Sequence, residues 1–451
     1  MMKSSAPKVI WPALPTPEGA SMLAVLFQLE SSQWHTGEEL LALQRRQLAK
    51  VLAHAIATVP FYRERFQDIR IRCLEDFTWE EWQQLPLLTR RDVQKAGQRL
   101  LSETVPEGHG SLNRLQTSGS TGTPITAYGT DVSQLFWRVF GLRDHLWHRR
   151  DFSAKHAVIR YAPGLKPGEA RQGPNWGQST APVFATGPLA IMAILTDVAT
   201  QAQWLMEQAP GYLLSYPSNI LALAQLFRKK NWQLPSLKEV RTIGESVGED
   251  VRKICREVWG VPIKDMYSSQ EIGYIALQCP EYEHYHVQSE TVLVEVLDDD
   301  NLPCPPGGIG RVVVSTLNNF AMPFIRYELG DYAEVGESCP CGRGLPVLTR
   351  ILGRRRNMLT APDGRTYWPS FPASTWAHIA PVRQLQIIQA DLQRLTVNLV
   401  VDRQLLPDEE RRLIDGLRAN LPYPFQVSLC FVERIERSRS GKYEDFVSLI
   451  R

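Results

Sequence analysis

The sequence predicts an α/β protein, with a large multilayer α/β N-terminal domain and a small mobile α+β C-terminal domain. Between residues 155 and 335, short apolar runs alternate with amphipathic stretches of helical period, which is typical of layered α/β architecture. The last hundred residues instead carry short strand-like runs around one charged helix. A break at about Gly353 separates the two patterns, and 451 residues suffice for more than one domain. We therefore expect domains at 1–352 and 353–451.

The first elements are expected to be helices. Leucines, valines and isoleucines recur at helical spacing over 36–70, and Thr36 with Glu39 forms the sequence of a capping box. A second helical run covers 132–140. Residues 86–91 read as a linker into another helix.

The central strands are predicted from short runs rich in β-branched and aromatic residues, and a Pro- and Gly-rich turn over 303–310 leads into the last of them. The predicted central strands are 157–160, 212–216, 239–243, 292–296 and 310–315. In the C-terminal domain the predicted strands are 384–389, 395–401 and 426–432, with a charged amphipathic helix at 408–417.

The composition excludes several classes of function. Apolar residues make up 43% and charged residues 22%, and the formal net charge is +2, so we expect no nucleic-acid partner. No run of about 18 apolar residues would span a membrane, and the first residues lack the apolar core of a signal peptide. We expect a cytoplasmic protein whose seven cysteines stay reduced.

The most informative segment is the loop over 115–124, which combines five hydroxyl side chains with two glycines. Glycines let backbone N–H groups approach closely and hydroxyls add donors, so such a loop can wrap a polyphosphate. It is not a Walker A loop, because no Gly-Lys-Ser/Thr follows at the required spacing. The alternative is a surface linker. The candidate phosphate-binding residues are Thr117, Ser118, Gly119, Ser120, Thr121 and Gly122.

Four further motifs follow this loop in a fixed order: 243–246, 267–271, 326–331 with 350–354, and 439–442. Together they resemble the ATP-dependent adenylate-forming superfamily of acyl-CoA synthetases, peptide-synthetase adenylation domains and luciferases. The segments 60–66, 85–90 and 216–218 are similar to signatures of its phenylacetate–CoA ligase-like branch. The resemblance covers nearly the whole chain.

The resemblance implies a role for each motif. The hydroxyl loop would hold the β- and γ-phosphates of ATP, and Glu271 would coordinate Mg²⁺. Lys442 would neutralise the charge that develops on the α-phosphate. The remaining nucleotide-binding residues would be Gly244 and Glu245 at the adenine, Tyr267 stacked on the base with Ser268 beside it, Asp331 at the ribose, and Arg354 at ribose or phosphate.

The implied reaction is attack of a carboxylate, expected to be aromatic or arylalkyl, on ATP to give acyl-AMP and pyrophosphate. The acyl group would then pass to CoA, with rotation of the small domain between the steps. Departures in the hinge, where Arg356 and Asn357 replace acidic residues, keep a second acceptor open, namely an amine. A nucleotide-binding relative without catalysis is the alternative from another class. A homodimer is expected only from the resemblance.

A second group of residues suggests a metal site. Cys339 and Cys341 flank a proline in a turn able to present two thiolates to one ion, and Cys279 with a nearby histidine could complete a closed, structural zinc site. Ordinary reduced cysteines and surface histidines are the alternative. The resemblance favours zinc, because members of this branch carry such a cluster. His286 is preferred to His284, since it alternates with apolar Val287, and the choice between them stays open.

Overall fold

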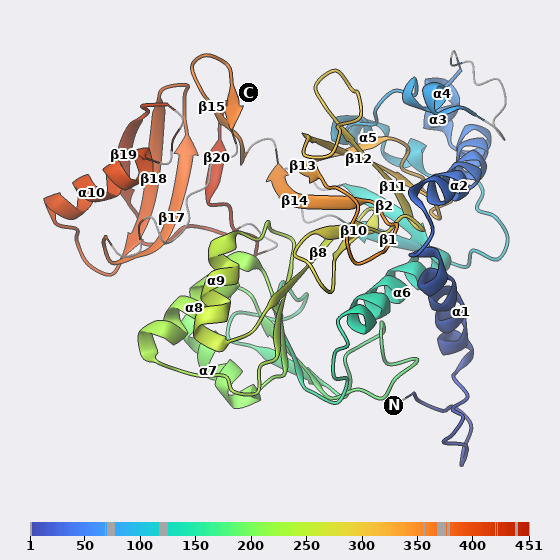
Figure 1. The fold of residues 1–451 in the computed structure, drawn as a ribbon, viewed down its shortest axis with the longest axis horizontal. Helices are drawn as coiled ribbons and strands as arrows, with labels where there is room; N and C mark the ends of the chain where they lie inside the picture. Colours follow the sequence, from blue (N-terminus) through green and yellow to red (C-terminus); the bar gives the residue numbers. More distant parts are fainter. Residues whose placement is uncertain are drawn as a thin grey trace. The chain divides into compact units, whose positions relative to one another are not determined.

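The computed structural model describes residues 2–67, 69, 77–116, 125–354, 357–367, 376, 379–419, 421, 423–437 and 441–450. The chain forms two compact units, each assembled from separate stretches (Figure 1). The first unit comprises Met1–His156, Arg171–Ala190 and Lys264–Ile351, and the second comprises Ala157–Ala170, Ile191–Ile263 and Leu352–Arg451. The second unit thus joins the C-terminal residues to two central stretches, and the domain division at residue 352 stays a prediction.

The first unit begins with helices and ends with strands. Its helices are α1 (Pro17–Ser32), α2 (Gly37–Thr58), α3 (Pro60–Arg65), α4 (Trp79–Gln83), α5 (Arg90–Ala96), a 3₁₀ turn at Gly97–Leu100, and α6 (Asp131–Trp147). Its strands are β1 (Leu112–Gln116), β2 (Thr126–Thr130), β4 (Ala170–Gly173), β8 (Ile263–Ser269), β9 (Gly273–Gln278), β10 (Tyr285–Val287), β11 (Val292–Leu297), β12 (Ile309–Thr316), β13 (Tyr327–Val335) and β14 (Val347–Arg354).

The helix predicted over 36–70 is confirmed at its start and wrong at its end. The Thr36 hydroxyl accepts a hydrogen bond from the Glu39 N–H, and the Glu39 carboxylate accepts one from the Thr36 N–H. The capping box at the start of α2 is therefore present. The helix stops at Thr58 because Pro60 follows: a proline lacks the N–H that would continue the ladder and favours the first turn of a new helix. The chain therefore bends at Val59 into α3.

The large sheet of the first unit runs β11-β12-β13-β14-β10-β9-β8. The pairs β11–β12, β12–β13, β14–β10, β10–β9 and β9–β8 are antiparallel. One face packs against α2 and the segments around it in a continuous apolar core that includes Leu48, Leu52 and Tyr62. This packing presents the ends of β8 and β13 on a rigid support.

The described part of the second unit contains the strands β7-β6-β3-β5, the two-stranded sheet β15-β16 and a four-stranded sheet. Its strands are β3 (His156–Arg160), β5 (Leu189–Ala193), β6 (Tyr212–Ser215), β7 (Glu239–Ile243), β15 (Leu359–Thr360), β16 (Thr366–Tyr367), β17 (Val382–Gln389), β18 (Arg394–Val401), β19 (Gln426–Phe431) and β20 (Phe446–Ser448), and its helices are α7 (Val198–Gln208), α8 (Pro217–Lys230), α9 (Glu249–Trp259) and α10 (Pro407–Arg418). The first sheet has the order β7-β6-β3-β5, with β6 and β7 parallel. Helices α8 and α9 pack side by side (Figure 1).

The small sheet, β19-β18-β17-β20, carries α10 across a core of alternating strand residues. Leu385 and Ile387 of β17 and Val397 of β18 are buried against Leu413 and Leu417 of α10. This alternation is the period-two pattern of a sheet with one covered face. The predicted strands and helix of this region are confirmed to within two residues at each end. The predicted mixed α/β fold class is confirmed as well.

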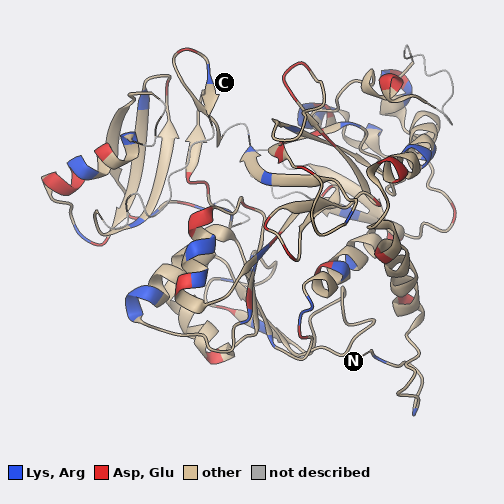
Figure 2. Ribbon diagram, in the orientation of Figure 1, with Lys and Arg blue, Asp and Glu red and all other residues tan. Residues whose placement is uncertain are grey.

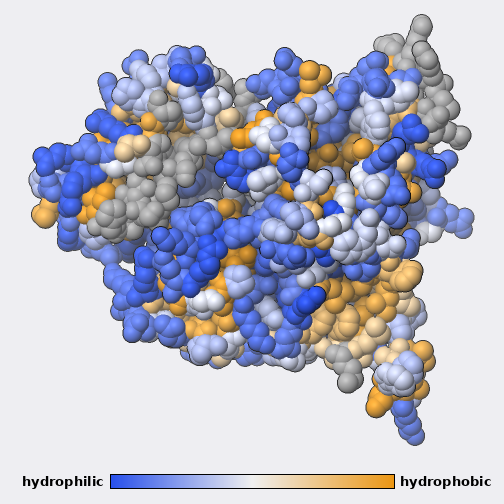
Figure 3. Space-filling model, in the orientation of Figure 1, coloured by the Kyte–Doolittle hydropathy of each residue, from blue (hydrophilic) through white to orange (hydrophobic). Residues whose placement is uncertain are grey.

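The surface carries mixed charge and one apolar area. Figure 2 shows Lys and Arg interspersed with Asp and Glu along α9 and α10, as the near-neutral net charge predicts. Figure 3 shows apolar side chains gathered at the lower right of the view, where Figure 1 places α1. In α1 and the segment before it, the exposed large apolar residues include Ile10, Trp11, Leu14 and Phe27. Over the described part of the chain, no helix is both long enough and apolar enough to cross a membrane.

Candidate functional site

The hydroxyl-rich loop lies outside the described residues, so its predicted phosphate contacts stay a prediction. What the structure does describe are its two ends. Strands β1 and β2 pair antiparallel, with Leu115 opposite Ala127. Ile125, the first described residue after the loop, is buried in the core. The loop Thr117–Gly122 therefore joins the two strands of a hairpin whose base is anchored by packing.

Tyr267 and Asp331 meet in the first unit. Tyr267 lies in β8 and donates a hydrogen bond of 2.9 Å from its hydroxyl to Oδ2 of Asp331 in β13. Both residues belong to strands. Gly330, beside Asp331, has a φ of 83°, a value that favours glycine. The two side chains predicted for adenine and ribose are thus held together.

Glu271 follows β8 in a tight turn. The Ile272 N–H donates to Oγ of Ser269 across this turn, 3.3 Å away. The Glu271 side chain is buried, with 8% of the residue exposed. Within the described residues its carboxylate makes no hydrogen bond or ion pair. Carboxylate oxygens are ligands that Mg²⁺ prefers, so the residue type at this position is compatible with a cation ligand.

Lys442 approaches Gly244 in the second unit. Gly244 directly follows β7 with a φ of 77°, and a Cβ placed on it would lie 3.0 Å from Cε and 3.3 Å from Nζ of Lys442. A Cβ on Gly353 would lie 3.3 Å from Oγ of Ser246, so the end of β14 that carries Arg354 borders the same segment. Three motifs that are distant in sequence therefore converge after β7.

The carboxylate of Glu245 is bound by backbone N–H groups. Oε1 accepts from the Tyr443 N–H at 2.6 Å, and Oε2 accepts from the Ser218 N–H at 2.9 Å. Burial raises the pKa of Glu245, while these hydrogen bonds and the nearby Arg437 lower it. The sequence analysis assigned Glu245 to the adenine and missed Arg437 and Tyr443. Ser218 did carry a signal, because 216–218 resembles a family signature.

The cysteines and histidines of the predicted metal site come together in the first unit. Ligand atoms of Cys279, His284, His286 and Cys339 all lie within 4.8 Å of one another. Nε2 of His284 is 2.9 Å from Sγ of Cys339. Cys341 joins the same group through its Sγ, 3.4 Å from Nε2 of His286. The structure thus brings His284 into the cluster together with His286, although the sequence preferred His286 alone.

The spacing of the two histidines explains this outcome. His286 lies in β10 and His284 immediately precedes it, and alternate residues of an extended chain project to the same face. The same argument applied to the sequence would have found both. The Cys339 carbonyl accepts from the Gly342 N–H at 3.2 Å, which confirms the predicted turn.

The chemistry of the cluster fits a metal ion. Burial lowers the pKa of His286 to about 4, so its imidazole is neutral and able to ligate at neutral pH. Burial also raises the pKa of Cys279, and it raises that of Cys339 to about 12. A buried group of three thiols and two imidazoles matches the ligand types of structural zinc.

The cluster is tied to the strands that carry Tyr267 and Asp331. The Cys279 N–H donates to the His284 carbonyl, which closes the turn between β9 and β10. The Tyr285 hydroxyl donates to Asp265 of β8 at 2.8 Å, and β10 pairs with β14 on its other side. A metal here would therefore brace the middle of the sheet between β8 and β13.

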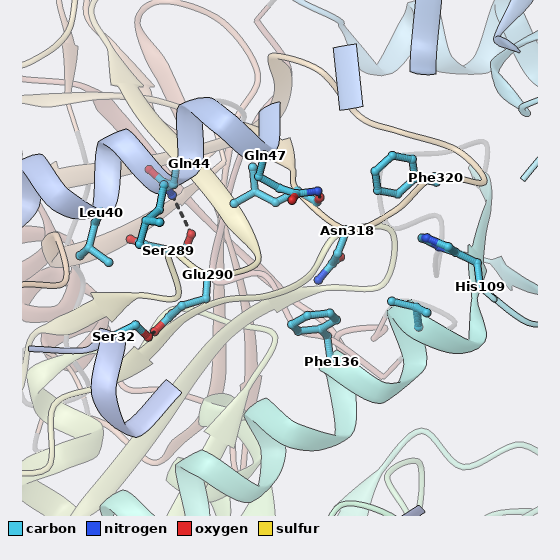
Figure 4. A pocket seen from close by; sticks show the side chains of 13 residues that line it. Ser32, Leu40, Gln44, Gln47, His109, Phe136, Ser289, Glu290, Asn318 and Phe320 are labelled. Carbon is cyan, nitrogen blue, oxygen red and sulfur yellow. Dashed lines mark hydrogen bonds between the residues drawn. The ribbon is translucent and has the colours of Figure 1, made fainter. Parts of the chain in front are cut away.

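A separate cavity of about 460 Å³ opens in the first unit between α2, α6 and the segment after β12 (Figure 4). Its amide groups already link these elements: Nε2 of Gln44 donates to the Ser289 carbonyl and Nε2 of Gln47 to the Leu317 carbonyl, each at 2.8 Å. Ser32 likewise donates to Glu290 at 2.7 Å. Its described lining includes no predicted site residue, and we assign it to packing.

Comparison with known proteins identifies related sequences. Residues 371–448 match the family model of the CapK C-terminal domain. The phenylacetate–coenzyme A ligase of Thermus thermophilus is 28% identical over 91% of this chain and 97% of its own length. The phenylacetate–coenzyme A ligase of Escherichia coli K12 is 24% identical over 78% of this chain and 79% of its own length.

Solved structures show the same fold. A 2-hydroxyisobutyryl-CoA ligase in the postadenylation state has a TM-score of 0.70, covering 92% of this chain and 91% of that one at 17% identity. An anthranilate CoA ligase in complex with anthranoyl-AMP has a TM-score of 0.52, covering 76% of this chain and 68% of that one at 14% identity. The resemblance to adenylate-forming acyl-CoA ligases, and among them to phenylacetate–CoA ligases, is confirmed.

Proposed function

We propose that this protein is an ATP-dependent acid–thiol ligase that activates a carboxylic acid as acyl-AMP and transfers the acyl group to CoA. The observation that carries the proposal is the approach of Lys442 to Gly244, two residues of separate motifs brought into contact within one unit. A lysine held against the end of a parallel strand suits a nucleotide site, since ligands of α/β sheets bind at the carboxyl ends of strands.

The resemblance supplies the proposed nucleotide-binding residues. Tyr267, with Ser268 beside it, would contact the adenine, and the resemblance gives Gly244 the same role, whereas the Glu245 carboxylate is already bound by the N–H groups of Tyr443 and Ser218. The loop Thr117–Gly122 would hold the β- and γ-phosphates. Asp331 and Arg354 would bind the ribose, and the bond between Asp331 and Tyr267 supports their joint role. Glu271 would hold Mg²⁺, which offsets phosphate charge when bound.

The chemistry proceeds in two displacements. A carboxylate oxygen attacks the α-phosphorus, the bond from that phosphorus to the bridging oxygen breaks, and pyrophosphate leaves. Lys442 would stabilise the charge that develops on the α-phosphate oxygens. In the second step the CoA sulfur attacks the acyl carbonyl, AMP leaves, and the thiol proton is lost to solvent.

The acid is proposed to be aromatic or arylalkyl, because the curated relatives are named phenylacetate–CoA ligases. CoA is the proposed acceptor for the same reason. The hinge residues Arg356 and Asn357 suggested an amine as the alternative acceptor. Arg356 lies outside the described part of the chain, and no further observation favours an amine.

We propose in addition that Cys279, His284, His286, Cys339 and Cys341 supply the ligands of a structural zinc ion. Their mutually close donor atoms support this proposal, and Cys279, His286 and Cys339 are buried. Because three thiols and two imidazoles exceed a tetrahedral set, one of the five would remain outside the coordination shell. The ion would brace the sheet and take no part in acyl transfer.

The test is pyrophosphate release with ATP, Mg²⁺ and a panel of aromatic and aliphatic acids, with and without CoA. We expect release that depends on an aromatic acid and acyl-CoA as product. Release that depends on an acid but yields product only with an amine would replace the thiol acceptor by an amine. Nucleotide binding without release under any condition would remove the catalytic proposal.

A further inference from the structure

The segment that carries Lys442 is held from both sides by neighbouring residues of the second unit. Gly441 is buried with a φ of 79°, and a Cβ on it would lie 2.4 Å from Cγ2 of Ile194. The Tyr443 hydroxyl donates to the Leu385 carbonyl at 2.7 Å. The lysine therefore sits on a peptide fitted between β5 and β17, with its own side chain against Gly244.

Glu245 supplies the shortest of these contacts. Its carboxylate bridges two backbone N–H groups, one on Tyr443, the residue after the lysine, and one on Ser218 at the start of α8. A carboxylate at the N-terminus of α8 is also favoured by the helix dipole. Glu245 thus links the lysine segment to the element that follows β6.

Arg437 completes the arrangement. One of its nitrogens, Nη1, donates to Oγ of Ser218 and to the Gly441 carbonyl, each at 3.0 Å. Its guanidinium lies 5.6 Å from the centre of the Tyr443 ring. Ser218 is therefore a shared point, where its N–H binds Glu245 and its hydroxyl binds Arg437. The charges of Glu245 and Arg437 are opposite and interact favourably.

We infer that Glu245 is a positioning residue for adenylation, which holds the backbone at Tyr443 so that the Lys442 ammonium stays beside Gly244. This inference rests on the proposed function of Lys442. A lysine has a long flexible stem, so its placement depends on how firmly its backbone is held. A displacement of about 1 Å at a reacting centre can cost about 100-fold in rate.

The test compares four purified variants of the full-length protein: Glu245→Ala, Glu245→Gln, Lys442→Ala and the double variant. Two rates are measured for each, namely acid-dependent pyrophosphate release and acyl-CoA formation from a synthetic acyl-adenylate with CoA. The affinity for ATP is measured separately by equilibrium binding. Glu249→Ala is the matched control, because Glu249 is an exposed carboxylate of α9 paired with Arg256.

We expect Glu245→Ala to lower the rate of pyrophosphate release about tenfold or more, with ATP affinity and the rate from acyl-adenylate nearly unchanged. Glu245→Gln keeps one acceptor oxygen but places an amide donor near a backbone N–H. Its rate of pyrophosphate release should therefore fall less than that of Glu245→Ala. The double variant should be no slower than Lys442→Ala, because both changes remove the same interaction.

Two results would overturn the inference. One is pyrophosphate release in Glu245→Ala equal to that of the control. The other is a double variant slower than Lys442→Ala together with weakened ATP binding, which would place Glu245 at the adenine. Failure of the proposed function is distinguishable, since the unaltered protein would then release no pyrophosphate with any acid.

Discussion

The two parts of the candidate site are built in different ways. Tyr267 and Asp331 lie on strands of one sheet, and the sheet is cross-linked nearby by Tyr285 and the Cys–His cluster. Lys442 lies on an irregular segment that is held by hydrogen bonds from the Tyr443 N–H to Glu245, from Arg437 to the Gly441 carbonyl and from the Tyr443 hydroxyl to the Leu385 carbonyl. Strand positions are held by many cooperative bonds, whereas a few loop contacts can be exchanged for water at small net cost.

This difference indicates a division of labour. In the proposed reaction, the strand positions would recognise the nucleotide, which both half-reactions need. The lysine, which is held by contacts of an irregular segment, would act in one half-reaction and then move away. Variants of the strand region should therefore change stability and ATP affinity, and variants of the lysine region should change the rate of adenylation.

The largest effect is expected for Lys442→Ala. Loss of a positive charge at the developing negative charge should lower acid-dependent pyrophosphate release by about 100- to 1000-fold. Acyl-CoA formation from a synthetic acyl-adenylate should keep its rate. Rapid-quench measurement of the two half-reactions checks this. Equal losses in both would erase the distinction between the two regions.

The second effect concerns the Cys–His cluster. Cys339→Ser should lower the zinc content per chain and reduce the free energy of unfolding by about 2 kcal/mol or more, because a metal that braces the sheet is lost. Metal analysis with denaturant unfolding measures both. Cys430→Ser, at an exposed cysteine outside the cluster, is the matched control. Full zinc content in Cys339→Ser would rule out this cysteine as a ligand.

A smaller effect is expected for Gly244→Ala. The positive φ is unfavourable for alanine, and the new methyl group would press on Cε of Lys442. Strain of this kind costs about 1–3 kcal/mol, so pyrophosphate release should fall about tenfold. Gly364→Ala offers a control, since Gly364 also has a positive φ but nothing lies within 4 Å of its Cβ position. The two variants should lose similar stability and differ in activity.

The smallest effect is expected for Tyr267→Phe. It removes one hydrogen bond to Asp331 while keeping the ring, so ATP affinity should fall about fivefold, equivalent to about 1 kcal/mol. Isothermal titration with ATP measures this change. A lower rate of pyrophosphate release by Tyr267→Phe at saturating ATP would instead show that Tyr267 affects adenylation itself. The two regions would then not differ in function as we describe.

Much of the fold could be predicted because its signals are local. The capping box at Thr36, the alternation of β17 and β18 and the helical period of α10 each depend on residues close in sequence. The end of α2 was not predicted, although Pro60, which cannot continue the hydrogen bonding of a helix, marks it in the sequence. The site could be predicted only as a set of motifs in order along the chain. A local sequence pattern does not indicate which residues of distant motifs are in contact.

The sequence by itself determined the α/β class, the resemblance to adenylate-forming ligases and the residue types of the cysteine–histidine group. Tertiary structure alone decided that the two histidines meet Cys279 and Cys339, and that Asp331 binds Tyr267. It also decided that the Glu245 carboxylate accepts a hydrogen bond from the Tyr443 N–H. The physical reason is that propensity and periodicity act over a few residues, whereas these contacts join residues up to 198 positions apart through packing of separate elements.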